Sequence, residues 1–132
     1  MQYDEFIRRV QKNARLDSPE EARELTEVVL GTLGERLYRT ERNDLAAQLP
    51  KEMKGFLFSQ QEPEQTRQEV RRFSLEEFYN RVRARTKVGY PTAVAQTQAV
   101  MQVFQEAISP GERGDALATL PDEFKELLQP EQ

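Results

Sequence analysis

Residues 41–57 read ERNDLAAQLPKEMKGFL, and residues 112–128, at a shift of 71 positions, read ERGDALATLPDEFKELL. Nine of these 17 aligned positions are identical, including the Leu-Pro pairs at 49–50 and 120–121. An internal repeat of this kind indicates two similar supersecondary units, each with an apolar face that it cannot bury alone.

The repeat continues on the N-terminal side of both stretches. Residues 5–10 align with residues 77–82 at a shift of 72, and residues 22–29 align with residues 93–100 at a shift of 71. The sequence therefore predicts a single domain with one shared core, built from a first repeat over 1–58, a polar connector over 59–73 and a second repeat over 74–129.

Apolar residues recur at helical spacing in both repeats. Phe6, Val10 and Ala14 show this period near the N-terminus, and Ala22, Val29 and Leu33 show it again in a second predicted helix. No stretch alternates with the period of two that a half-buried strand needs. The predicted fold class is all-α: two tandem repeats of a four-helix unit, about eight helices, packed into one compact helical domain.

Several residues mark where these helices are expected to begin. Serines followed three positions later by Glu form capping boxes at Ser74 and Ser109, and Asp17 or Ser18 precedes a proline and two acids. Thr40 is the expected cap of a short helix. Pro50 and Pro121 are expected to open the last helix of each unit, and the connector is expected to be partly helical after Pro63.

The helical period also predicts which side chains form the core. Each residue of this set lies on the apolar face of a predicted helix, and each Phe→Ala change within it is expected to cost about 3–5 kcal/mol. The set comprises Phe6, Val10, Leu25, Val29, Leu33, Leu49, Phe56, Leu57, Phe78, Val82, Val100, Met101, Phe104, Leu120, Phe124 and Leu128.

Composition limits the chemistry that the chain can perform. Of its 132 residues, 37% are hydrophobic and 32% charged, the net charge is −4, and there is neither Cys nor His. Zinc sites built from Cys and His, and catalysis by Ser-His-Asp or Cys-His groups, are therefore excluded. With no signal peptide and no apolar run long enough for a membrane span, we expect a cytoplasmic protein without a cofactor.

The repeated block places acids at matching positions of the two units. Glu41, Asp44, Glu112 and Asp115 could form a polar cluster between the repeats, and such a pseudo-twofold set of carboxylates could hold a divalent cation. The simpler interpretation is structural, since acids favour the first turn of a helix and duplication alone reproduces their positions. The sequence favours the structural interpretation and assigns no metal ligand.

The stretch 67–87 is the most basic part of the chain. Arg71, Arg72, Arg81 and Arg85 are the candidate basic patch, and Arg81 and Arg85 share a helix face. Nucleic-acid binding needs a contiguous basic face, because phosphate contacts supply most of the non-specific affinity. The negative net charge favours a solvated helix face instead.

Two glycines lie inside the longest predicted helix of the first unit. Gly31 and Gly34 each cost stability relative to Ala there. Gly31 is either a tolerated surface glycine or a point where a second helix, from the other unit or a partner chain, approaches closely. The second unit has Gln102 and Gln105 at the matching positions, so such a contact would be asymmetric.

Several short motifs together resemble one known family. They are Tyr-Asp-Glu-Phe at 3–6, Leu-Gly-Glu-Arg-Leu at 33–37, Leu-Ala-Ala-Gln-Leu-Pro at 45–50, Glu-Glu-Phe at 76–78 and Leu-Pro-Asp-Glu-Phe at 120–124. This set is similar to the bacterial family known as domain of unknown function (DUF) 2267, over nearly the whole chain. The resemblance implies a helical fold and no particular activity.

The biochemical function is not fixed by these patterns. They favour a non-enzymatic helical module that binds an unknown protein partner or itself, because two repeated units form an extended helical surface. The alternative is a small-ligand or divalent-cation binder, or a carboxylate-based enzyme, with a cleft between the repeats. Nucleic-acid binding through residues 67–87 is the weaker alternative, and no catalytic residue is predicted.

Overall fold

The computed structural model describes residues 1–60 and 73–128, and within these ranges the chain is helical and has no strand. The all-α prediction is therefore confirmed for the described residues. The α-helices are α1 (Tyr3–Asn13), α2 (Pro19–Arg36), α3 (Arg39–Ala47), α5 (Leu75–Thr86), α6 (Tyr90–Ala107), α7 (Pro110–Ala118) and α8 (Lys125–Leu128). Short 3-10 helices are η1 (Lys51–Met53), η2 (Phe56–Phe58) and η4 (Asp122–Phe124).

Serine caps begin three of these helices as the sequence predicts. The hydroxyl oxygens of Ser18, Ser74 and Ser109 each accept a hydrogen bond from the backbone N–H three residues later, at 3.2, 3.1 and 3.2 Å. Each bond satisfies a donor at the first turn that has no partner within its helix. These three starts are therefore fixed by local sequence.

Three predicted helix starts are wrong. Tyr38 occupies the cap position of α3 without a side-chain cap, while the hydroxyl of Thr40 donates to the carboxylate of Glu41 at 2.7 Å. Pro50 and Pro121 lie just before η1 and η4 with extended ψ values of 149° and 156°, so neither is the first helical residue. The turns that follow them are 3-10 helices of three residues each, and η4 leads directly into α8.

The predicted core is confirmed in full. All 16 residues of the set are buried, none of them more than 7% exposed. The rings of Phe6, Phe78, Phe104 and Phe124 are among the largest side chains without solvent contact. Buried residues from both halves of the chain form one contiguous cluster, with helix contacts both within each half and between the halves.

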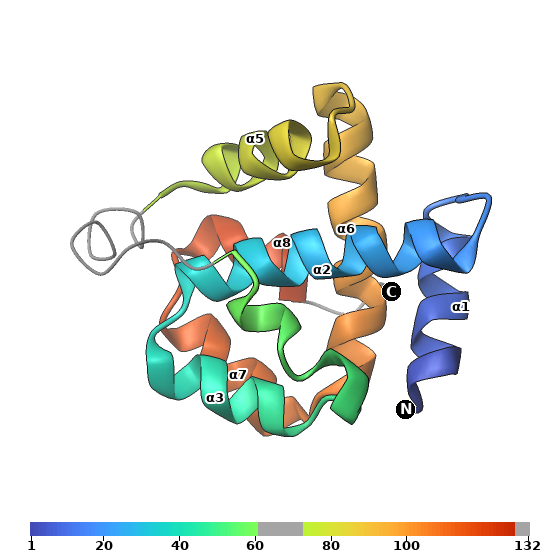
Figure 1. The fold of residues 1–132 in the computed structure, drawn as a ribbon. Helices are drawn as coiled ribbons and strands as arrows, with labels where there is room; N and C mark the ends of the chain where they lie inside the picture. The colour runs from blue at the N-terminus through green and yellow to red at the C-terminus, as the bar shows by residue number, and fades with distance from the viewer. Residues whose placement is uncertain (61–72, 129–132) are drawn as a thin grey trace.

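Four long helices build this core (Figure 1). α2 crosses the middle of the molecule and contacts α1, α5 and α6, while α1 lies beside α6. α3 and α7 lie side by side at one end. α2 and α6 both have 18 residues and α3 and α7 both have 9, at the shift of 71 seen in the sequence. This positional correspondence allows the two halves to be compared residue by residue.

The glycines of α2 have a role that the sequence did not reveal. An added Cβ at Gly34 would lie 1.7 Å from the carbonyl oxygen of Leu57, and at Gly31 it would lie 2.4 Å from the hydroxyl of Ser59. Gly31 is buried and contacts residues that follow η2 in the same half. The interpretation of a surface glycine is therefore wrong. A close approach does occur at Gly31, but it comes from Ser59 and Gln60 after η2 and not from a helix of the other unit.

Two further expectations concern the polar connector and a membrane span. Within the predicted connector 59–73, residues 61–72 lie outside the described residues, and so does the helix expected after Pro63. Among the described residues, no helix combines the length and the apolar content needed to cross a bilayer.

Candidate functional site

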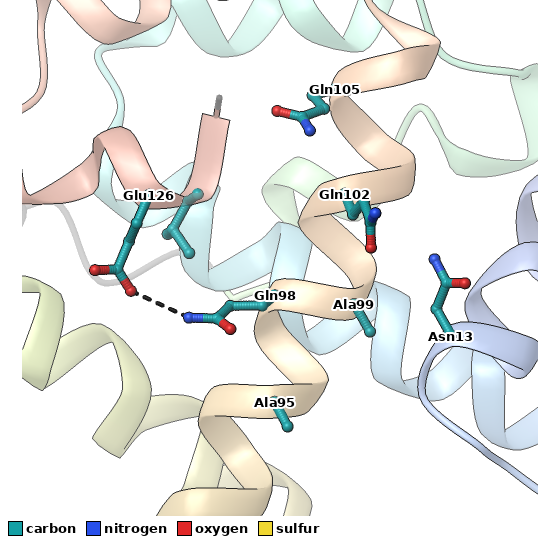
Figure 2. Close-up of a pocket in the computed structure, with 8 residues that line it drawn as sticks. Asn13, Ala95, Gln98, Ala99, Gln102, Gln105 and Glu126 are labelled. Carbon is teal, nitrogen blue, oxygen red and sulfur yellow. Dashed lines mark hydrogen bonds between the residues drawn. The ribbon is translucent and has the colours of Figure 1, made fainter. Parts of the chain in front are cut away.

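An open groove lies along α6, between the end of α1 and α8 (Figure 2). Its volume is about 360 Å³, within the range of ligand-binding clefts. The residues that line it are Asn13, Ala95, Gln98, Ala99, Gln102, Gln105, Glu126 and Leu127. Because side-chain amides dominate the lining, we refer to these eight residues as the amide groove.

The helical repeat of α6 places its part of the lining on one face. Ala95, Gln98, Ala99, Gln102 and Gln105 follow one another at spacings of three, one, three and three residues. At about 100° per residue they cover one side of the helix. The two alanines leave room for another chain to approach the helix backbone, and the glutamines extend to either side of them.

A hydrogen-bonded group closes one side of the groove. The phenol of Tyr79 on α5 donates to Glu126 Oε2 at 2.5 Å, and the amide of Gln98 donates to the same oxygen at 3.2 Å. Burial, followed by the hydrogen bond to Glu126, raises the pKa of Tyr79 far above its ordinary value. The phenol therefore keeps its proton at neutral pH and holds Glu126 in place as a donor.

Gln105 is the unusual residue of the groove. It is only 3% exposed, and its side-chain oxygen Oε1 accepts no hydrogen bond from the described residues. An unpaired buried amide oxygen costs about 1–3 kcal/mol, and folded proteins rarely retain one without a reason. Figure 2 shows this side chain extending from α6 on the side that faces α8.

The first half of the molecule shows what occupies the same place on α2. At the shift of 71, Gly31 and Gly34 correspond to Gln102 and Gln105. Leu57 of η2 lies against Gly34, and Ser59 and Gln60 after η2 lie against Gly31; the hydroxyl of Ser59 also donates to the carbonyl oxygen of Glu27 on α2 at 3.2 Å. The longer side chains of Gln102 and Gln105 would not allow so close a contact on α6. The residues that correspond to 58–60 in the second half, 129–131, lie outside the described residues.

The groove continues toward the start of α6. An adjoining hollow of about 380 Å³ shares Asn13 and Ala95 with it and reaches Pro91 and Thr92, with Arg15 at its edge. Together the two hollows follow α6 from Pro91 to Gln105. At a rise of about 1.5 Å per residue, this path is roughly 21 Å long.

The chemistry of the lining suits binding more than catalysis. Glu126 is the one ionisable side chain among the eight residues of the amide groove. General acid–base catalysis needs a group that gains or loses a proton close to the reacting atoms, usually with a second group to orient it. Amides, by contrast, offer both a donor and an acceptor of hydrogen bonds without changing charge.

The four predicted acids are only partly brought together. The pKa of Glu112 is raised by burial first, and then by the negative charges of Asp44 on α3 and Asp115 on α7. Glu41 instead accepts the hydrogen bond from Thr40. Among residues 1–60 and 73–128, no group of three or more acids is arranged to hold a metal ion.

The predicted basic residues have a different setting. Arg81 and Arg85 on α5 both form ion pairs with Glu35 of α2, at 3.2 and 2.5 Å, and the side chain of Glu35 is only 1% exposed. The two guanidinium groups therefore face the interior contact between α2 and α5. Arg71 and Arg72 lie outside the described residues.

Sequence reasoning did not identify the amide groove. Gln98, Gln102 and Gln105 share a helix face, and this polar stripe on a helix that is otherwise rich in apolar residues was the available signal. Asn13 and Glu126 join the site only through folding, since they lie far apart in the sequence.

Comparison with known proteins agrees with the resemblance seen in the sequence. Residues 3–127 match the family model described as "Uncharacterized conserved protein (DUF2267)". No curated protein matches the chain. The match covers nearly the whole sequence and includes every residue of the amide groove. The chain therefore belongs to the DUF2267 family of uncharacterized conserved proteins.

Proposed function

We propose that this protein is a non-enzymatic helical interaction module of the cytoplasm, and that its amide groove binds an extended polypeptide segment of a partner protein. The roughly 21 Å path along α6 matches about six residues of extended chain, which rises about 3.3 Å per residue. Ala95 and Ala99 leave space for a backbone to lie against the helix. The length and the small floor residues both support a peptide as the ligand.

The lining also complements the polar groups of a peptide. An extended backbone presents N–H and C=O groups that need partners when they leave water. The amide of Asn13 carries the same two kinds of group, and the side-chain oxygen of Gln98 can accept, since its N–H groups already donate to Tyr79 and Glu126. An amphipathic helix would need an apolar groove instead, so the polar lining favours an extended segment.

The single observation that carries the proposal is the buried, unpaired Oε1 of Gln105. A backbone N–H of a bound segment would supply the hydrogen bond that this oxygen lacks, once the Gln105 side chain turns from its buried position into the groove. The unpaired oxygen slightly destabilises the free protein and gains a hydrogen-bond partner when the peptide binds. This compromise between stability and function is common at binding sites.

Binding can be tested with random heptapeptides displayed on phage and selected against the whole chain. A selected peptide, synthesised and titrated, should perturb the NMR signals of Gln98, Gln102 and Gln105. Gln105→Leu should weaken binding about tenfold while leaving stability unchanged or higher, because it removes an unsatisfied buried acceptor. Ala95→Trp should block the groove.

Ala84→Trp is the matched control, since Ala84 is an exposed residue on α5 outside the groove. It should bind the peptide like the unmodified chain. The proposal fails if no peptide is selected, or if the selected peptides bind Ala95→Trp and Ala84→Trp equally well.

A further inference from the structure

A second hollow, of about 430 Å³, lies between α1 and the first turns of α2. Its apolar walls come from Tyr3 and Ile7 on α1 and from Pro19 at the start of α2. We call this hollow the α1–α2 notch. Asn13, which lines the amide groove, follows Gln11 of the notch by two residues, about 200° around the helix. The notch is therefore a separate site on another face of α1.

The second half of the chain shows which side chains fill the matching position. At the sequence shifts of 72 and 71, Ile7 corresponds to Tyr79 and Pro19 corresponds to Tyr90. The rings of Tyr79 and Tyr90 pack edge to face, 6.1 Å apart and at 86°. Between α5 and α6 the corresponding space thus holds two aromatic rings. Ile7 and Pro19 supply much smaller groups between α1 and α2, and the notch is left open.

The charges at the rim of the notch restrict what can enter it. Asp4 and Arg8 of α1 and Glu20 and Arg23 of α2 also line the notch, and all four are exposed; Arg23 forms an ion pair with Glu27 at 3.1 Å, so Arg8 is the guanidinium available to a ligand. A guanidinium group is attracted to the face of an aromatic ring, and Arg23 already lies 5.4 Å from the ring centre of Phe56. A carboxylate accepts a hydrogen bond from a phenol, as Glu126 does from Tyr79.

From this charge complementarity and from the filled counterpart, we propose that the α1–α2 notch binds the side chain of a tyrosine from a partner protein. The ring lies against Ile7 and Pro19, beneath a guanidinium group of the rim. The phenol donates to Asp4 or Glu20. A leucine side chain would fill the apolar space but would use neither kind of rim charge, so the notch discriminates between the two. This inference does not depend on the amide groove.

The isoleucines of the chain allow a direct test. Ile7 lines the notch, and Ile108, the other isoleucine of the sequence, is buried at the end of α6 and does not line it. In protein labelled with ¹³C at the isoleucine δ-methyl groups, N-acetyl-tyrosinamide should shift the Ile7 signal saturably. A dissociation constant on the order of 1 mM is expected for so small a ligand. The Ile108 signal should stay in place, and N-acetyl-leucinamide should have little effect.

A filled notch provides the blocking variant. Pro19→Tyr places at the first position of α2 the residue that begins α6, so its ring should occupy the notch and weaken binding of the tyrosine probe at least about tenfold. Arg39→Tyr introduces the same residue at the first position of α3, where Arg39 is exposed, and should leave binding unchanged. Urea melts of both variants would show that they fold.

Each other result counts against the proposal. An unmoved Ile7 signal at about 10 mM probe, tenfold above the expected dissociation constant, would exclude a tyrosine site. Equal shifts with the leucine probe would exclude aromatic selectivity, and equal shifts of Ile7 and Ile108 would mean non-specific binding. Tyr38 is 50% exposed on the chain itself. If raising the protein concentration alone shifts Ile7, and Tyr38→Ala abolishes that shift, then the occupant is a second copy and the partner-protein proposal is wrong.

Discussion

Gly34 shows how one residue can fix the position of a neighbouring segment. Its α-carbon faces the backbone of Leu57 so closely that an added Cβ would lie 1.7 Å from the carbonyl oxygen. A flexible side chain could move aside, but this backbone is held between α2 and the core, where Leu57 is 1% exposed. The glycine is therefore required for packing, despite its cost in the interior of a helix.

We predict that Gly34→Ala destabilises the protein by about 1–3 kcal/mol through overpacking. Gly114 is the matched control, because it lies inside α7 with no atom within 4 Å of an added Cβ. Gly114→Ala should stabilise by about 0.5–1 kcal/mol, the usual gain in a helix interior. Urea denaturation of both variants measures the difference, and a gain in both would show that residues 57–60 do not press on α2.

Glu112 gives a prediction about pH. Burial first, then Asp44 and Asp115, raise its pKa in the folded state. An acid with a raised folded pKa destabilises the fold at pH values above both its folded and unfolded pKa, and this penalty disappears as the pH falls and the group is protonated. Glu112→Gln should therefore raise the melting temperature at about pH 7 and have no effect at about pH 3.

The variant Asp44→Asn serves as the control for this effect. Asp44→Asn removes one of the two negative charges that raise the pKa of Glu112. Glu112→Gln should therefore raise the melting temperature less in the Asp44→Asn background than in the unmodified chain. Thermal melts at both pH values provide the measurement. A gain of equal size at about pH 7 and about pH 3 would mean that the charge of Glu112 is not its cause.

At the scale of the helices, Glu35 connects α2 to α5. Its carboxylate pairs with Arg81 and Arg85, and Arg85 also donates to the hydroxyl of Thr32 at 2.8 Å. The guanidinium of Arg81 lies 3.9 Å from the ring centre of Phe73, just before α5. Two helices from different halves are thus held in one orientation by charges that are largely removed from water.

We predict that Glu35→Ala costs about 3 kcal/mol, because it removes the buried carboxylate that joins two partly buried guanidinium groups, although Arg81 keeps its ion pair with Glu77. Glu5→Ala is the control: Glu5 pairs with Arg9 at 2.7 Å on the surface of α1, with 37% and 45% of these two side chains exposed. That change should cost less than about 0.5 kcal/mol. Equal losses in urea melts would show that burial adds nothing to the Glu35 pairs.

At the scale of the whole molecule, the two halves pack on one another. α1 packs on α6, and α2 packs on both α5 and α6, so each half supplies part of the surface that buries the other. The contiguous core contains residues of both halves. A half of about 55–60 residues without disulfides or zinc has a marginal core of its own.

We therefore predict that residues 1–60 and 72–132, expressed separately, do not fold well. Each fragment would expose the apolar side chains that it buries against the other half in the intact chain. Far-UV circular dichroism and urea melts of each fragment, compared with the intact protein, provide the test. A cooperative, native-like transition in either fragment as a monomer would show two independent domains.

The sequence by itself determined the helical class, the three helix starts capped by serine, and the core. These features are local: a serine cap acts within one turn, and the helical period places Phe6 or Phe78 on a buried face whatever lies opposite. The positions of Pro50 and Thr40 were misjudged because a proline or threonine suits several turn conformations equally well, and the packing of the following segment selects one.

The tertiary structure alone decided the candidate sites. The amide groove needs Asn13, α6 and Glu126 to meet across more than a hundred residues of sequence, and the Glu35 ion pairs join positions 46 and 50 apart. The polar stripe that includes Gln98 does not by itself distinguish a groove from a solvated helix face, because the same residues would suit either. The helical period of apolar residues indicates which side of a helix faces inward. A hollow depends instead on the distance between neighbouring helices. That distance is set by contacts such as those of Gly34 and Gln105, which only the folded chain brings together.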